Sequence, residues 1–392
     1  MKKIMKQFYV ALALVAGMMN FAACSDDDDN NDSRNDLEGT IANGTTLKGT
    51  ITSDVTLKAG NSYKLSGEYI VEAGATLHIE EGVTITAVYD DVVDYILVKQ
   101  GAKIEAVGTA DKPIVMTSEK QEPGAWGGIH ICGKAHTNAE GGKGSSEIGG
   151  AAYGGNDDSD NSGRLQYVRV EYTGYAFDEE HEANGITFYG VGSGTTVDHC
   201  QAYKGSDDGF EFFGGSVNIS YMVVVSCSDD SFDWTEGWNG KAAHLVAYQE
   251  PEATLGYDCD CLIEADNNEN NYQATPVSHP VLSDLLLVGN SSANGKRGIR
   301  LRRGTQVEIS GAKVSGKGNA VTLESEETEN ALKNGTSKLI NMQVDSDLKS
   351  EKSIYTNDDF LAAGNTVDSA LSFANWSAVK SAATWISGSW VK

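Results

Sequence analysis

Apolar and polar residues alternate over short runs through most of the chain, and glycines separate these runs. Between residues 37 and 118 the runs include YIVEAG, TLHIEEG and VTITAV. Alternation over four to six residues is typical of half-buried β-strands, and none of these runs has a helical period. The pattern therefore predicts an all-β fold made of short strands and turns.

The middle of the chain repeats itself. NGITF, DGFEF and DSFDW start at residues 184, 208 and 230, which are 24 and then 22 residues apart, and RGIRL (297–301) and NAVTL (319–323) are again 22 apart. A short fixed period indicates a solenoid, and repeats made of strands and turns favour a β-helix. We predict a single right-handed parallel β-helix over residues 37–368, with Phe210 and Phe232 stacked in its core.

Several segments break the period and are expected to be loops. The longest is 133–163, and the others are 250–260, 267–280 and 324–335. Excursions of this kind usually leave one side of a solenoid and shape its binding face. Residues 369–392 carry a weak helical pattern and a last apolar run (385–391), so we expect a small C-terminal cap that covers the end coil and contains a final strand.

The N-terminus has the features of an export signal. Residues 1–23 combine three lysines with a short apolar stretch, and FAA precedes Cys24. This arrangement resembles a bacterial lipoprotein signal in which Cys24 is lipidated. Residues 24–36 are an acidic tether that resembles the surface-export signal of lipoproteins from glycan-foraging Gram-negative bacteria. We expect an outer-membrane lipoprotein at the cell surface, held there by lipid alone.

Composition limits the classes of partner. The 392 residues contain 30 Lys and Arg against 56 Asp and Glu, a net charge of −26, and cations this sparse argue against nucleic-acid binding. Five cysteines follow Cys24; their odd number leaves at least one outside an intramolecular disulfide, and their spacing does not suit zinc.

Five stretches resemble a widespread family of secreted bacterial β-helix proteins that has no agreed activity. They are RLQYVRVEYTG (164–174), NGITFYGVGSGTTVDH (184–199), GSDDGFEFFGGSVN (205–218), DDSFDWTEGWNGK (229–241) and IEADNN (263–268). A looser resemblance is to the pectin-active β-helix enzymes, whose Asp-Asp turn is matched by Asp207-Asp208. The Gly-His-Gly step of the polygalacturonases is absent, which argues against hydrolysis of that type.

An acidic ladder is the sharpest candidate site. If Phe210 and Phe232 point inward, Glu211 and Asp233 point outward on successive coils, about 5 Å apart. The preceding turns carry Asp207, Asp208, Asp229 and Asp230. Three explanations are open: a calcium ion held by these four aspartates, a raised pKa that makes Glu211, Asp233 or Asp208 a general acid, or capping of backbone N–H groups in the turns.

Aromatic and basic residues lie near this ladder. Trp234, Trp238 and Tyr189 are candidate platforms for a sugar ring, and Trp238 is expected to be the most exposed of them. Arg300 and Arg302 either pair with neighbouring carboxylates or hold an anionic substrate, with Arg300 as a catalytic base.

These features lead to three functional hypotheses. The first is a lipid-anchored surface protein that binds an extracellular polysaccharide. The second is a polysaccharide lyase or glycoside hydrolase that acts on uronate-rich glycans, with Glu211, Asp233, Asp208 and Arg300 in its catalytic site. The third is an adhesin or scaffold that binds a protein partner.

Overall fold

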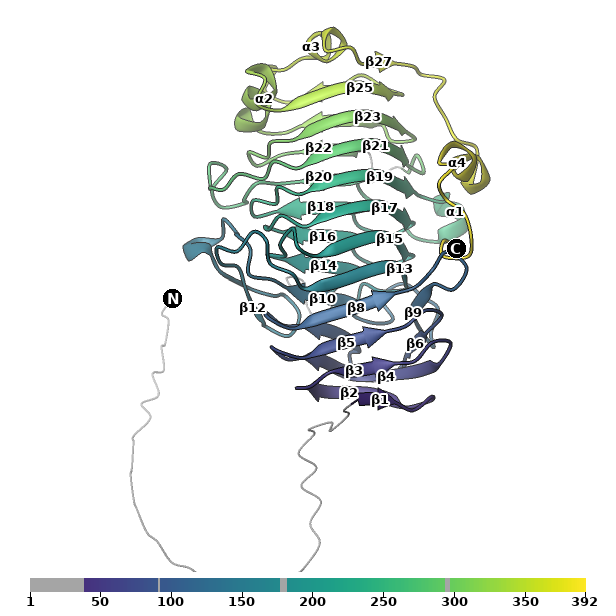
Figure 1. Cartoon of the computed structure of the whole chain (residues 1–392). Helices are drawn as coiled ribbons and strands as arrows, with labels where there is room; N and C mark the ends of the chain where they lie inside the picture. The colour runs from purple at the N-terminus through teal and green to yellow at the C-terminus, as the bar shows by residue number, and fades with distance from the viewer. Residues whose placement is uncertain (1–38, 91, 177–181, 293–296) are drawn as a thin grey trace, which may run out of the picture. The chain divides into compact units, whose positions relative to one another are not determined.

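Parallel strands stack into a right-handed β-helix, as the repeat predicts (Figure 1). The computed structural model describes residues 39–392 except 91, 177–181 and 293–296. The predicted signal peptide (1–23), Cys24 and the acidic tether (24–36) therefore lie outside the described residues. The first coils contain short strands and one long strand: β1 (Gly39–Ile41), β2 (Thr46–Ile51), β3 (Val55–Leu57), β4 (Ser62–Val71), β5 (Thr76–Ile79), β6 (Thr84–Ala87), β7 (Tyr95–Val98), β8 (Lys103–Val107), β9 (Ile114–Ser118) and β10 (Ile129–Cys132).

From β13 onward each coil contains one long and one short strand. The long strands are β13 (Gly163–Glu171), β15 (Thr196–Tyr203), β17 (Asn218–Val225), β19 (Lys241–Tyr248), β21 (Val281–Val288), β23 (Glu308–Ser315) and β25 (Lys338–Val344). The short strands are β14 (Ile186–Tyr189), β16 (Phe210–Phe213), β18 (Phe232–Thr235), β20 (Ile263–Ala265), β22 (Arg297–Leu301), β24 (Asn319–Leu323) and β26 (Lys349–Ser350).

Each long strand bends in its middle and so contributes to two ladders of paired strands. The bend in β15 is at His199 and that in β17 is at Tyr221, both with positive φ. Residues before the bend continue the first ladder (β1, β3, β5, β8), and residues after it continue the second (β6, β9). The short strands, from β7 and β10 to β26, form a third ladder. Every coil therefore has three faces.

Alternation decides which side chains fill the core. In β16 and β18 the first and third residues are buried and the second points outward. The Phe210 and Phe232 rings stack with their centroids 5.8 Å apart, which confirms the predicted pair. Phe188 stacks on Phe212 at 5.2 Å in the same core. Burial of stacked apolar side chains on consecutive coils is the main source of stability in such a solenoid.

The 133–163 excursion packs against the outer face of the third ladder. It contains a small antiparallel pair, β11 (Gly144–Ser145) and β12 (Ala152–Tyr153). Its Ile148 and Tyr153 form an apolar cluster with Tyr95, Cys132 and Tyr189 of the coils. The excursion thus covers the coils next to the acidic ladder and forms one wall beside it.

The helices lie outside the coils. Two of the predicted loops contain short helices, α1 (Glu252–Leu255) and α2 (Glu326–Lys333), and Ser325 caps α2 through its hydroxyl. Near the last coil lie α3 (Asn357–Ala362) and β27 (Thr366–Val367) (Figure 1). No described helix is long and apolar enough to cross a membrane.

The C-terminal segment corrects one expectation. It does not cover the end coil: after β27 it runs back along the flank of the second ladder, where α4 (Trp376–Ala382) and Trp390 pack against Tyr248 and Val246 (Figure 1). Residues 385–391 form no strand. The outward residues of the second ladder are apolar here, and burying them against the C-terminal segment stabilises the segment in this place. We call residues 369–392 the strap.

Candidate functional site: an acidic cleft on the third ladder

A single outward column of the third ladder carries the predicted acidic ladder. Thr187 in β14 lies next to Glu211 in β16, Glu211 next to Asp233 in β18, and Asp233 next to Glu264 in β20. Arg300 in β22 follows Glu264. The predicted neighbourhood of Glu211 and Asp233 is therefore confirmed, and the alternation of each short strand is what turns both carboxylates outward.

The turns before these strands carry a second column that caps backbone N–H groups. The Asn184 side-chain oxygen accepts from the Asp208 amide (3.2 Å), and Asp208 Oδ1 accepts from the Asp230 amide (2.8 Å). Asp230 Oδ1 in turn accepts from the Cys261 amide (2.6 Å). One aspartate of each Asp-Asp pair thus satisfies a backbone donor of the next coil, as the capping explanation requires.

The two columns enclose a cleft of about 360 Å³. The other member of each pair, Asp207 or Asp229, also lines it, and the 133–163 excursion adds Glu147. The lining is almost wholly carboxylate: Glu147, Glu182, Asp207, Asp208, Glu211, Asp229, Asp230, Asp233, Asp260 and Glu264, with Asn184 and Arg300. A wall of oxygen acceptors suits hard cations and ligands rich in hydroxyl or ammonium donors.

The crowding shifts the acidity of these groups. Burial raises the pKa of Asp208, Glu211, Asp230 and Asp233 well above the ordinary carboxyl range, and repulsion between neighbouring carboxylates adds to the rise. The pKa of Asp229 rises to about 6 for the same two reasons. The side chain of Asn184 donates to Glu211 Oε2 at 2.5 Å and opposes the rise at that residue. Without a bound cation, these four carboxyl groups therefore tend to stay protonated.

Arg300 and Arg302 are already paired with carboxylates. Arg300 contacts Glu264 (2.6 Å) and Glu324 (2.9 Å), and Arg302 contacts Asp266 through Nε (2.7 Å) and also pairs with Glu264. Of the two explanations offered for Arg300 and Arg302, these contacts agree with pairing to neighbouring carboxylates. Arg300 lines the cleft, whereas Arg302 is not among its lining residues.

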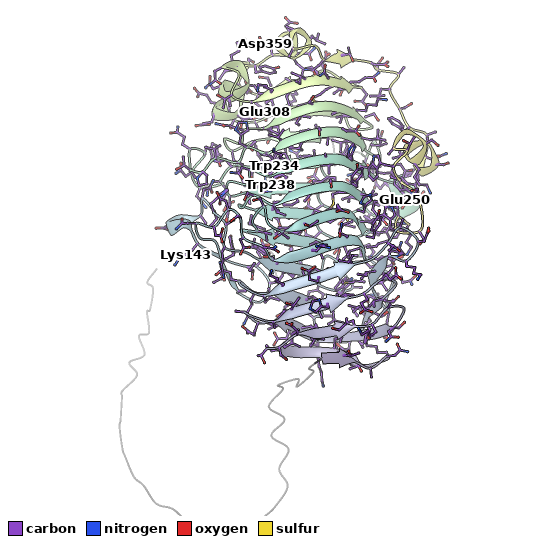
Figure 2. All side chains as sticks on the ribbon, viewed as in Figure 1. Lys143, Trp234, Trp238, Glu250, Glu308 and Asp359 are labelled. Carbon is purple, nitrogen blue, oxygen red and sulfur yellow. The ribbon has the colours of Figure 1, made fainter. Side chains whose placement is uncertain are left out.

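The three predicted aromatic platforms are buried, so the expectation that Trp238 is exposed is wrong. Trp234 and Trp238 are each 1% exposed and lie within the coils (Figure 2). Trp238 stacks on Phe212 at 4.3 Å, and its indole N–H donates to the Val217 carbonyl (3.1 Å). Tyr189 points outward but lies beneath the 133–163 excursion, 5.2 Å from the Tyr153 ring. None of these rings is open to a ligand from solvent.

The predicted calcium ligands do not form one set. Carboxylate oxygens of Asp208, Asp229 and Asp230 lie within 4.8 Å of one another, but Asp207 groups with Glu182 and Asp229. Of the lining residues, Asn184, Glu147, Glu182 and Asp260 were not among the sequence candidates. Asn184 had a usable signal, since it occupies in NGITF the place of Asp208 and Asp230 in the next repeats. Glu147 lies in an excursion without a period.

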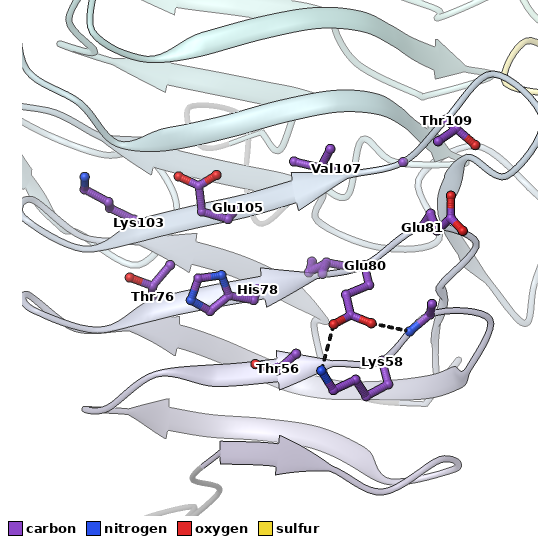
Figure 3. Close-up of a pocket in the computed structure, with 13 residues that line it drawn as sticks. Thr56, Lys58, Thr76, His78, Glu80, Glu81, Lys103, Glu105, Val107 and Thr109 are labelled. Atoms are coloured by element: carbon purple, nitrogen blue, oxygen red, sulfur yellow. Dashed lines mark hydrogen bonds and ion pairs between the residues drawn. The ribbon is translucent and has the colours of Figure 1, made fainter.

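A larger hollow lies on the first ladder of the N-terminal coils (Figure 3). It measures about 890 Å³ and is a shallow, open groove lined by residues such as Thr56, His78 and Glu105. Lys58 at its edge is paired with Glu80 at 2.8 Å. The groove mixes both signs of charge, so its chemistry is less specific than that of the acidic cleft.

The five described cysteines are all buried and free, and Cys200 lies in the core as a small apolar residue. Burial raises the pKa of the Cys227 thiol to about 12. A thiol that stays protonated is a poor nucleophile, and none of these five described cysteines lines the cleft.

Comparison with protein families agrees with the observed coils. The model described as "Pectate-lyase like beta helix domain" matches residues 49–391, most of the chain. The chain belongs to this pectate-lyase-like β-helix family. Comparisons with curated proteins and with solved structures found no match. Membership of the family fits a polysaccharide-related role in general terms.

Proposed function

We propose that this protein binds an extracellular polysaccharide in the acidic cleft while a lipid on Cys24 holds it at the outer surface of the outer membrane. The observation that carries the proposal is the cleft itself, in which carboxylates from at least four successive coils line one continuous hollow. Carboxylate oxygens accept hydrogen bonds from sugar hydroxyls, and charged acceptors make such bonds strong. Family membership is consistent with a polysaccharide ligand.

The lining also constrains the ligand. Because the candidate platforms Trp234, Trp238 and Tyr189 are buried, recognition relies on hydrogen bonds to hydroxyls and not on ring stacking. Those of the ten lining carboxyl groups that are ionised would repel an anionic sugar directly. A uronate-rich chain would therefore need a cation between its own carboxylates and those of the cleft. We include calcium in the proposal, held either by Asp208, Asp229 and Asp230 or by Asp207 with Asp229 and Glu182, in keeping with the preference of Ca²⁺ for carboxylate oxygens.

Retention on immobilised polysaccharides tests binding. The purified protein is expected to be retained by at least one polymer in a panel of neutral and uronate-rich glycans, and more weakly after Asp229→Asn. Glu326→Gln is the matched control, since Glu326 is exposed on α2 and does not line the cleft. No retention on any polymer, with calcium or with a chelator, would contradict the proposal.

Fractionation of cells tests the anchor. Cys24→Ala removes the only thiol that the predicted signal offers for lipidation, so the protein is expected to move from the membrane fraction to the soluble fraction. Protease added to intact cells is expected to digest the lipidated protein. Unchanged membrane association of the variant would show that another element holds the protein there.

A glycan-cleaving enzyme is the second candidate, and the raised pKa of Glu211 and Asp233 favours it because a general acid must hold a proton near neutral pH. Assays for new reducing ends and for unsaturated products on uronate-rich polymers distinguish a hydrolase from a lyase. Glu211→Gln, Asp208→Asn and Arg300→Ala are each expected to lower such an activity by about 100-fold or more. Activity unchanged in all three would place the chemistry elsewhere.

A further inference from the structure

One carboxylate of the cleft comes from outside the coils. Glu147 lies in the 133–163 excursion, whereas the other lining carboxyl groups lie on the coils or in the turns between their strands. The excursion has no repeat period, so stacking of equivalent residues does not fix where Glu147 points. Its position depends on the contacts that the excursion makes with the coils.

Tyr189 holds this carboxylate. Its hydroxyl donates to Glu147 Oε2 at 3.1 Å. Tyr189 is fully buried, and its ring stacks on Phe213 at 4.8 Å and lies 5.2 Å from the Tyr153 ring. Burial raises the pKa of Tyr189 well above its ordinary value, so the phenol stays a hydrogen-bond donor. Because packing fixes the ring, it also fixes the place in which the hydroxyl holds Glu147.

Like charges oppose this position of Glu147. Burial is the main cause of the raised pKa of Glu211, and the charge of Glu147 is the next. The charge of Glu147 also adds to the raised pKa of Asp207, after burial and the charges of two other carboxylates. A glutamate side chain is flexible and would turn away from such charges into solvent. The neutral hydroxyl of Tyr189 opposes that motion and keeps the carboxylate at the cleft.

Glu236, in the turn after β18, fastens the two sides of the excursion. Its Oε2 accepts from the Thr137 hydroxyl at 2.7 Å and from the Tyr153 hydroxyl at 2.8 Å. Thr137 precedes Glu147 in the chain and Tyr153 follows it, so one carboxylate holds the segment on both sides of Glu147. The backbone of Glu236 has a φ of 55°, which glycine adopts more readily, and the two hydrogen bonds are what the glutamate side chain adds.

We propose that Glu147 is a specificity-determining residue, which accepts a hydrogen bond from the polysaccharide in the cleft, and that Tyr189 and Glu236 are its positioning residues. Tyr189 orients the carboxylate, and Glu236 holds the segment that carries it. The partner of Glu147 is a hydroxyl or ammonium group of the sugar on this side of the cleft. The inference rests on the proposed function, since it needs a polysaccharide in the acidic cleft.

A double-mutant cycle on the dissociation constant in affinity electrophoresis tests the inference. The probe is the polymer of the neutral and uronate-rich panel that retains the wild-type protein most strongly. Glu147→Gln and Tyr189→Phe are each expected to weaken binding about 10-fold, as for a lost hydrogen bond to a charged group. The double variant should bind no more weakly than Glu147→Gln alone, because Tyr189 acts through Glu147. Tyr63→Phe is the matched control and should bind like the wild type, since the buried Tyr63 hydroxyl donates to the Ile41 carbonyl (3.2 Å) in the N-terminal coils.

Glu236 supplies a second set of variants in case Tyr189→Phe folds poorly. Glu236→Ala is expected to weaken binding, and Glu236→Gln, which keeps an acceptor oxygen, should recover part of it. Neither should weaken binding further in a Glu147→Gln background. Wild-type binding by Glu147→Gln, or losses for Glu147→Gln and Tyr189→Phe that add in the double variant, would overturn this inference and leave the proposed function standing. If no polymer of the panel retains the wild-type protein, both are overturned.

Discussion

Single aspartates in the cleft serve two purposes at once. Asp208 and Asp230 each give one oxygen to a backbone amide of the next coil, and their side chains are about 95% buried. Capping fixes where each side chain points, so adjacent coils hold like charges close together. The resulting repulsion between carboxylates destabilises the folded protein unless protons or cations neutralise them.

The pH dependence of stability follows from the direction of these shifts. Because the folded pKa of Asp229 is about 6 and those of Asp208 and Asp233 are also raised, the folded protein binds more protons than the unfolded chain above about pH 4. Stability of the metal-free protein is therefore expected to fall as pH rises from about 4 through 6 and beyond. Urea unfolding in a chelator at pH 5 and pH 7.5 measures this.

Calcium should flatten that dependence, because an ion replaces the protons. If the metal-free protein is instead more stable at pH 7.5 than at pH 5, the carboxylates are not repelling one another as the geometry indicates. Glu326→Gln should show the same pH profile as the wild type, since its carboxylate is exposed.

The strap ties the C-terminal residues to the flank of the solenoid. Its Trp390 is 1% exposed, and the Tyr167 ring lies at a right angle to it with a centroid distance of 6.0 Å. Arg169 donates to the Ser389 carbonyl (2.8 Å), and Lys392 pairs with Glu171 (3.0 Å). The strap thereby joins the last residues of the chain to β13, a strand more than 200 positions earlier in the sequence.

Truncating the buried Trp390 side chain of the strap should destabilise the protein. Trp390→Ala is expected to cost about 3–5 kcal/mol in the free energy of unfolding, since a large buried ring leaves a cavity. Leu361→Ala, at a 41% exposed residue of α3, is the control and should change stability by less than about 0.5 kcal/mol. A loss for Trp390→Ala no larger than that of the control would show that the strap is not stabilising.

At the scale of the whole solenoid, each coil is paired with the coil before it and the coil after it. Stability is then close to a sum of coil and interface contributions, and the end coils have one neighbour instead of two. The strap and the 133–163 excursion add further apolar contacts to coils in the middle of the solenoid.

Amide hydrogen exchange should reflect this arrangement. Exchange is expected to be slowest in β15, β17 and β19 and fastest in β1 and β26, because opening an end coil breaks only one interface. Mass spectrometry of peptides from each coil measures the gradient. Equal protection of end and middle coils would mean that the solenoid opens as one unit.

The sequence by itself determined the fold and which residues lie next to one another on successive coils. Alternation with period 2 fixed that Glu211 points outward, and the 22-residue repeat placed Asp233 beside it, since stacking translates each coil onto the next. The same repeat contained the capping column, with Asn184 in the place of Asp208. Strand position and repeat position are local properties, so they can be read without knowing the rest of the fold.

Only the tertiary structure decided what covers each face. Trp238 lies in a Gly-Trp-Asn-Gly turn that suggests exposure, yet its ring enters the core above Phe212. Tyr189 points outward as alternation predicts, but the 133–163 excursion buries it, and the strap lies on the flank and not on the end coil. These contacts join segments that share no period, and the apolar area they bury depends on packing between distant residues, which no local pattern encodes.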